Sequence, residues 1–350
     1  MLREIKYGAL SGKTRAMFGK LLNETDYQEL IRKKNVGEIL TYLKNSNTPY
    51  AEALSEVDEG SIHRGHLENL IKHIFVNEFG KILRFARNDT KVITQLMYRR
   101  IEIESLKLIF RVFASGKPEH GVLEDSLLFL TGHDNIHLPK LALSNNLEEF
   151  LSGLKGTDYY EVLRPFASET TANRMFNMEM ALDLYYLKLL KKSSMKWLSG
   201  RDRVIANAFV DVEIDMFNIF WIYRSKSYYT IPTEVIRSYI LPNYGKIGKT
   251  TIEALLSAKS QEEFVRVLAE TRYRFLFSSE NEILNEHNYL EFIYKYYRHR
   301  FRADSFSIAC VFSYIRLKEI EMGNLISIIE GVRYRLPPER MRYFVAGIPN

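Results

Sequence analysis

The chain has 350 residues, of which 46% are hydrophobic and 26% charged, as in folded proteins rather than disordered ones. Its length is enough for two or three domains, and its net charge of +6 falls short of that of a nucleic-acid-binding protein. The single cysteine, Cys310, excludes an intramolecular disulfide and is typical of a reducing compartment.

The segment from Asn23 to Leu54 predicts two helices, because its apolar residues recur at helical spacing before the turn at Thr48-Pro49-Tyr50. A related passage returns at Leu141–Leu163 and at Leu255–Phe277, each time with a glutamate before an apolar residue and with Thr-x-Tyr at its end. The glutamates of these passages, Glu38, Glu149 and Glu263, lie 111 and 114 residues apart. This period predicts a repeated unit.

A second motif repeats in the same order and at nearly the same period. It consists of an acid, an isoleucine and a second acid, then two variable positions and Lys or Asn, and it begins at Glu102, Glu213 and Glu319. These glutamates are 111 and 106 residues apart. The two motifs together predict three related helical units, residues 1–117, 118–230 and 231–350, with joints where Gly and Pro interrupt the pattern.

The segments between the motifs are amphipathic at helical spacing, and strand signals are missing. We therefore predict an all-α fold. The first six residues contain no apolar core of the kind that a signal peptide has. The longest strongly apolar stretch, Phe217–Tyr223, is too short to cross a bilayer. We expect a cytosolic protein with no membrane span.

Two short sequences suggest a phosphate-binding loop, and neither fits its pattern. Ser11-Gly12-Lys13-Thr14 has Tyr7 where the first glycine of the loop is needed, and Gly248-Lys249-Thr250 has Asn243 there. The histidines of His133–His137 lack a cluster of further ligands. We expect no catalytic residue, no cofactor and no metal site.

The basic and aromatic stretch Tyr294–Arg302 has two interpretations. Such a stretch can contact RNA phosphates and bases, or it can form an amphipathic helix whose charged side meets water or another protein. The second interpretation is favoured, because the charge is local and the bias of the whole chain is small.

The glutamates that open the second motif, Glu102, Glu213 and Glu319, fall between apolar positions of their helices. A carboxylate on an apolar side must be paired, or its desolvation destabilises the fold. Arg99 and Arg316 lie one turn before Glu102 and Glu319. We therefore predict that the three glutamates belong to structural ion pairs, in preference to functional carboxylates.

Further residues along the whole chain carry a family resemblance: Tyr7-Gly8-Ala9, Arg15-Ala16-Met17, the repeated Thr-x-Tyr passages, Glu319–Asn324 and Gly331–Glu339. In their order and period, they resemble the C subunit of the bacterial and archaeal rotary A/V-type ATPases, which is the homologue of the d subunit of the eukaryotic V-ATPase. The resemblance implies a funnel of three similar helical subdomains about a pseudo-threefold axis. One departure is Lys107, where the second and third copies of the motif carry Asn.

The resemblance also implies a function. It describes a non-catalytic rotor subunit of the central stalk, which couples the shaft subunits to the membrane proteolipid ring for ATP-linked proton or sodium transport. Such a subunit is peripheral on the cytoplasmic face of the cell membrane and binds no nucleic acid. The alternative is an all-α repeat scaffold or an RNA-binding protein.

Two further expectations concern single residues. The last copy of the second motif continues into Arg333 and Arg335, which we predict to contact a partner. In the three copies, Leu108, Ile219 and Leu325 are predicted to be core residues.

Overall fold

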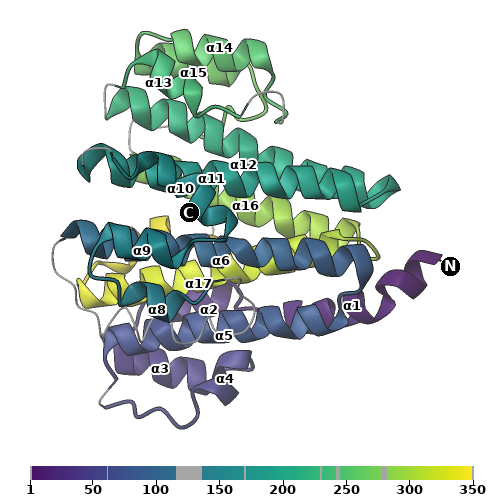
Figure 1. The fold of residues 1–350 in the computed structure, drawn as a ribbon. Coiled ribbons are helices and arrows are strands. Elements are labelled where there is room, and N and C mark those ends of the chain that lie inside the picture. The colour runs from purple at the N-terminus through teal and green to yellow at the C-terminus, as the bar shows by residue number, and fades with distance from the viewer. Residues whose placement is uncertain are drawn as a thin grey trace. The chain divides into compact units, whose positions relative to one another are not determined.

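The computed structural model describes residues 2–60, 62–115, 136–168, 171–228, 231–241, 245–277 and 282–348 (Figure 1). These residues form helices joined by turns, and no strand occurs among them, which confirms the all-helical prediction. They group into two compact units, Met1–Ala86 with Tyr273–Asn350, and Arg87–Arg272. The predicted joints at residues 117 and 230 lie outside the described residues, so the division into three units stays a prediction.

The first unit brings both ends of the chain together. Its long helix α17 packs against α1, α5 and α16, and its short helices α2–α4 form what we call the first short-helix cluster. The helices of this unit are α1 (Leu2–Phe18), α2 (Glu24–Leu30), α3 (Val36–Lys44), α4 (Pro49–Ala53), α5 (Arg64–Phe85), α16 (Glu282–Ala303), α17 (Ala309–Arg333), α18 (Pro338–Met341) and the 3-10 helix η3 (Arg342–Phe344).

One apolar core holds this cluster to the end of the chain. Residues of the first cluster and of α5, such as Leu40 and Ile71, pack with Leu325 and Ile329 of α17, and all four are fully buried. The last turns of the chain contribute Val345 to the same core. The first cluster is therefore complete only when the C-terminal helix covers it.

In the second unit, α11 packs between α6 and α12. The second short-helix cluster, α8–α10, contacts α6 through α8, and the third, α13–α15, contacts α12. The helices of this unit are α6 (Asn88–Ser115), α8 (Leu138–Ala142), α9 (Leu147–Gly153), α10 (Asp158–Leu163), η2 (Arg164–Phe166), α11 (Thr171–Trp197), α12 (Gly200–Ser227), α13 (Thr233–Ser238), α14 (Lys249–Ser257) and α15 (Gln261–Ala269).

The repeated glutamate of the short-helix clusters is a capping residue. In α3, the side chain of Asn35 accepts the N–H of Glu38 at 2.9 Å, while Glu38 accepts the N–H of Lys34 at 2.9 Å. The same exchange begins α9 at Glu149 and α15 at Glu263. Reciprocal caps of this kind pair the backbone donors that a helix leaves open at its start. The first repeated motif is therefore a set of helix-start signals.

The Thr-x-Tyr triplets end these clusters with a buried tyrosine. Thr48 and Thr157 are the N-cap residues of α4 and α10. The tyrosines that follow, Tyr50, Tyr159 and Tyr273, are 1%, 1% and 0% exposed. A buried phenol needs a hydrogen-bond partner, and two of these partners define the site described below.

Several sequence interpretations can be checked against the helices. Ser11-Gly12-Lys13-Thr14 lies inside α1, where Thr14 Oγ1 donates to the Leu10 carbonyl at 2.9 Å, so it forms no phosphate-binding loop. Tyr294–Arg302 lies in α16, with Tyr297 and Phe301 buried, as an amphipathic helix requires. Cys310 is buried, and His133 lies outside the described residues.

Candidate functional site

Three carboxylates on the long helices are almost fully buried. Glu102 of α6, Asp215 of α12 and Glu321 of α17 are 2%, 0% and 2% exposed. Each accepts hydrogen bonds from residues of the neighbouring short-helix cluster or from the segments that flank its helices. We call each of these arrangements a carboxylate clasp.

The Glu321 clasp lies in the first unit. Its Oε1 accepts the hydroxyl of Tyr50 at 2.9 Å, and its Oε2 accepts the backbone N–H of Leu22 at 2.6 Å. Burial, followed by the Glu321 charge, raises the pKa of Tyr50 well above its usual value, so its hydroxyl remains a donor. The carboxylate therefore ties both ends of the first cluster to α17.

A buried lysine completes this clasp. Lys318 is 1% exposed, and its Nζ donates to Glu321 Oε1 at 2.5 Å. The same Nζ lies 4.4 Å from the ring centroid of Tyr50, which is within the range of a cation–π contact. A buried charge pair of this kind is tolerated because both groups also have other polar or aromatic partners.

The Glu102 clasp lies in the second unit and uses the same kind of donor. The hydroxyl of Tyr159 donates to Glu102 Oε2. Burial and the Glu102 charge raise the pKa of Tyr159 far above its usual value. Arg99, which the sequence places one turn before Glu102, donates instead to Asp158 at 3.0 Å.

The Asp215 clasp binds backbone instead of side chains. The N–H groups of Lys246 and Ile247, just before α14, donate to the two oxygens of Asp215 at 2.8 and 3.2 Å. A Cβ at Gly245 would overlap the carboxylate, so only glycine lets the chain approach Asp215 so closely. The third cluster is thus attached to α12 through the segment between α13 and α14.

These contacts change how the first copy of the second motif is aligned with the other two copies. Glu102 binds the tyrosine of a Thr-x-Tyr triplet as Glu321 does, so Glu102 corresponds to Glu321 and not to Glu319. The three clasp carboxylates are 113 and 106 residues apart. Glu213 and Glu319 lie two residues before Asp215 and Glu321, on less buried positions of their helices.

Glu213 and Glu319 contact arginines. Arg100 Nη1 lies 3.4 Å from Glu213, and Arg316 Nη1 lies 2.7 Å from Glu319. The side chains of Glu213 and Glu319 are 12% and 22% exposed. The structure therefore brings each of these glutamates to an arginine and Glu102 to a tyrosine, so the three do not form one equivalent set.

In two of the three copies, an asparagine three residues after the clasp carboxylate forms a second contact with the backbone. The side-chain amide of Asn324 both donates to the carbonyl and accepts the N–H of Ala346, each at 2.9 Å. Asn218 exchanges the same two bonds with Leu241 at 3.1 Å. In the corrected register, the first copy has Ser105 there, whose hydroxyl bonds to the Ile101 carbonyl of its own helix.

The corrected alignment also changes two earlier expectations, one about Lys107 and one about the core residue Leu108. Lys107 does not replace Asn; its Nζ contacts Asp183 of α11 and Glu104. Leu108 is only half-buried, whereas Leu106, the residue equivalent to Leu325, is fully buried. The expectation for Leu108 was therefore wrong by two residues.

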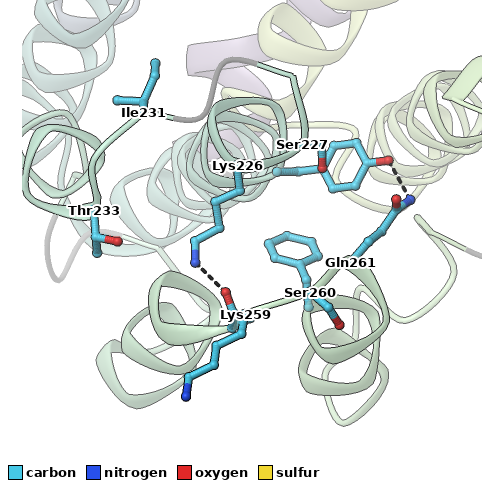
Figure 2. A pocket seen from close by; sticks show the side chains of 10 residues that line it. Lys226, Ser227, Ile231, Thr233, Lys259, Ser260 and Gln261 are labelled. Carbon is cyan, nitrogen blue, oxygen red and sulfur yellow. Dashed lines mark hydrogen bonds between the residues drawn. The ribbon is translucent and has the colours of Figure 1, made fainter.

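The second unit also contains a pocket of about 380 Å³ between the end of α12 and the third cluster (Figure 2). Lys226 Nζ donates to the Ala258 carbonyl at 2.6 Å, and Gln261 donates to the Tyr223 hydroxyl at 2.9 Å. Burial lowers the pKa of Lys226. The residues that line this pocket include no Asp, Glu, His or Cys, and the ammonium of its Lys226 is held by a backbone carbonyl.

The family is decided by a match over almost the whole chain. Residues 10–344 match the family model of the ATP synthase (C/AC39) subunit. The chain belongs to this family.

Curated relatives of this ATP synthase family member agree with the assignment over nearly the full length. The chain is 25% identical to the C subunit of the A-type ATP synthase of Methanocaldococcus jannaschii, over 96% of this chain and 85% of that protein. It is 23% identical to the protein of the same name from Pyrococcus abyssi, over 97% and 90% of the two chains. For the Archaeoglobus fulgidus protein of that name, the identity is 24% over 94% and 93%.

In this ATP synthase family member, the predicted contact residues Arg333 and Arg335 lie at the end of α17. Both are exposed. Arg335 has a φ of 54°, and the N–H of Leu336 bonds to the Gly331 carbonyl at 2.9 Å. This is a left-handed helix end of the type that glycine usually forms, and it costs a residue with a side chain roughly 1–2 kcal/mol.

Two features are absent from the part of this ATP synthase family member that the structure describes. None of its helices there is both long and apolar enough to cross a bilayer. Within the same residues, no group of three or more His, Cys, Asp or Glu side chains is placed to hold a metal ion.

Proposed function

We propose that this protein is a non-catalytic rotor subunit of an A/V-type ATP synthase, a socket that joins the central shaft to the membrane proteolipid ring. Membership of the ATP synthase (C/AC39) subunit family supports this role. The observation that carries the proposal is the structural use of the buried carboxylates. Glu102, Asp215 and Glu321 each accept hydrogen bonds from donors that fix a neighbouring segment, so they hold the fold together.

We further propose that the chain forms three equivalent modules arranged as a pseudo-threefold funnel. Each module pairs one clasp helix with one short-helix cluster: α6 with α8–α10, α12 with α13–α15, and α17 with α2–α4. The third clasp helix holds the first cluster, and in this proposal the modules form a closed series. A closed series of equal modules is a stiff collar, which a part that transmits torque requires.

The proposed partners are the shaft subunits and the proteolipid ring, with the protein peripheral on the cytoplasmic face of the membrane. The choice between proton and sodium transport belongs to the ring in this proposal. Arg333 and Arg335 are the proposed partner contacts, because they are exposed on a backbone turn that α17 holds in a strained conformation.

The test is reconstitution of membrane vesicles depleted of this protein. Adding it back should restore ATP-driven ion pumping, and the tagged protein should co-purify with the shaft and the ring. The double variant Arg333→Glu/Arg335→Glu should restore less pumping than a Lys34→Glu control, since Lys34 is also exposed but lies between α2 and α3 of the first cluster. Unchanged pumping without the protein, or co-purification with nucleic acid in place of these partners, would overturn the proposal in favour of a scaffold or RNA-binding protein.

A further inference from the structure

The turn between α11 and α12 exposes large apolar side chains. Met195, Trp197 and Val204 are 52%, 41% and 68% exposed, although they lie within ten residues of one another. Soluble proteins rarely expose contiguous apolar side chains unless that surface contacts something. We call the residues from 188 to 204 the turn surface.

Cations surround these apolar side chains. The exposed basic residues of the turn surface are Lys188, Lys192, Lys196, Arg201 and Arg203. Its one acid, Asp202, is buried, so the turn surface exposes no carboxylate. Lys196 Nζ lies 4.9 Å from the ring centroid of Trp197, which places positive charge directly beside the exposed indole.

The start of α6 lies at the same end of the second unit. Helices α6 and α11 run antiparallel, because Arg111 contacts Glu179 while Lys107 contacts Asp183. The first residues of α6 therefore lie beside the last residues of α11. This segment adds the exposed Lys91 and the half-buried Asp89 of α6, together with the exposed Arg87 just before the helix, and the end of the unit stays basic.

The turn surface is fixed in shape. Leu198 is 1% exposed, and its carbonyl accepts Nε of Arg203 at 2.7 Å. Gly200, with φ of 52°, lets the chain reverse between the two long helices within a few residues. The N-cap residue Ser199 makes no side-chain cap, so the positive end of the α12 dipole adds to the charge of the turn.

The corresponding turns of the first unit repeat the exposed aromatic residue. Phe85 ends α5 and is 41% exposed, and Phe306 lies between α16 and α17 and is 45% exposed. Phe85, Trp197 and Phe306 are 112 and 109 residues apart, close to the period of the whole chain. An exposed aromatic side chain at this turn is therefore a property of the repeat.

We propose that the turn surface binds the surface of an anionic lipid bilayer. Trp197, Met195 and Val204 enter the interfacial region, while the surrounding lysines and arginines contact lipid phosphates. Tryptophan prefers the boundary between head groups and acyl chains, and long cationic side chains reach from there to phosphate. Exposed apolar and cationic side chains share one turn, and this combination is typical of segments that bind an anionic lipid surface. This lipid contact goes beyond the rotor role and does not depend on it.

The chain carries its own probe for this contact. It has two tryptophans, and Trp221 is 6% exposed with its indole N–H donated to the Ile236 carbonyl at 2.9 Å. A change in tryptophan emission on binding therefore reports Trp197. The purified full chain should be mixed with vesicles of phosphatidylglycerol and phosphatidylcholine, some with brominated acyl chains, and with vesicles of phosphatidylcholine alone.

With anionic vesicles, we expect a blue shift of the emission and quenching by the brominated chains, and both should weaken as salt is added. Trp197→Phe should abolish the response. The triple variant Lys192→Gln/Lys196→Gln/Arg201→Gln should bind roughly tenfold to a hundredfold more weakly, since each cation near an anionic surface contributes to the affinity. A triple control, Lys155→Gln/Lys249→Gln/Lys259→Gln, removes the same charge from exposed sites elsewhere in the unit and should bind normally.

Three outcomes would overturn the proposal. They are an absence of bromine quenching with anionic vesicles, equal weakening in the two triple variants, and an emission shift produced by RNA or polyglutamate but not by vesicles. The last outcome would identify the turn surface as a site for an acidic macromolecule. None of them bears on the rotor role, which the pumping experiment tests separately.

Discussion

The Glu321 and Asp215 clasps occupy the same position of the repeat and are built differently. Glu321 binds a tyrosine hydroxyl, a backbone N–H and a buried lysine, whereas Asp215 binds two backbone N–H groups beside a glycine. The first joins residues 271 and 299 positions apart, and the second joins residues 31 and 32 positions apart. The longer connection has the larger loop-closure cost and carries the additional ion pair and cation–π contact.

The largest expected effect comes from removing the ion pair of the longer clasp. Lys318→Met leaves the Glu321 charge buried without its counter-ion and should lower the free energy of unfolding by about 3–5 kcal/mol. Arg32→Met is the control, because Arg32 pairs with Glu29 at the same spacing but the two side chains are 61% and 43% exposed, and it should cost at most about 1 kcal/mol. Chemical denaturation followed by circular dichroism measures both, and equal losses would show that burial does not govern the pair.

The shorter clasp, at Asp215, should be weakened by moving the backbone that donates its hydrogen bonds. Gly245→Ala pushes the chain away from Asp215 and weakens two hydrogen bonds to a charged acceptor, at a cost of about 3 kcal/mol. Tryptophan fluorescence isolates this effect, because Trp197 and Trp221 both lie in the second unit. Gly12→Ala in α1, where a Cβ meets no atom within 4 Å, should instead stabilise its helix by up to about 1 kcal/mol. Wild-type stability of Gly245→Ala would contradict the role of this glycine.

The asparagine that follows the clasp can be compared with the serine at the same position of the first copy. Asn324→Ala leaves the buried N–H and carbonyl of Ala346 without these partners and should cost about 2 kcal/mol. Ser105→Ala should cost less than about 1 kcal/mol, because its hydroxyl bonds only within its own helix. The two free energies of unfolding, measured under the same conditions, test the corrected register; a larger loss at Ser105 would refute it.

The smallest effect appears only at high pH. Folding raises the pKa of Tyr50 and Tyr159 above the value near 10 of the unfolded chain, so their contribution is complete below about pH 10 and is lost as the pH rises further. Each tyrosine should steepen the loss by about 1.4 kcal/mol per pH unit. Unfolding measured between pH 9 and 11 should therefore be less pH-dependent in Tyr159→Phe, whereas the exposed Tyr334→Phe should behave as wild type.

Helix content and the repeats were predictable because their causes are local. Glu38, Glu149 and Glu263 cap helices through residues three or four positions away, and such spacing is visible in the sequence. The period of the two motifs came from the same local patterns.

The register of the carboxylates was not predictable in this way. Glu102 and Glu104 are both acids in one helix, and only the hydroxyl of Tyr159, 57 residues further on, identifies Glu102 as the clasp. Asn218 and Asn324 were recognised as part of the repeated motif, but their backbone partners, Leu241 and Ala346, were not predicted. Partners from distant segments decide these roles.

The shared core of the chain ends has a consequence for synthesis on the ribosome. Leu40 and Ile71 emerge before the second unit, but Leu325, Ile329 and Val345, which cover them, are made only after it. Residues 87–272 contain the partners of their own clasps and can fold while translation continues. We therefore expect the amino-terminal cluster to acquire protection from protease only after Val345 has emerged from the ribosome, and later than the second unit.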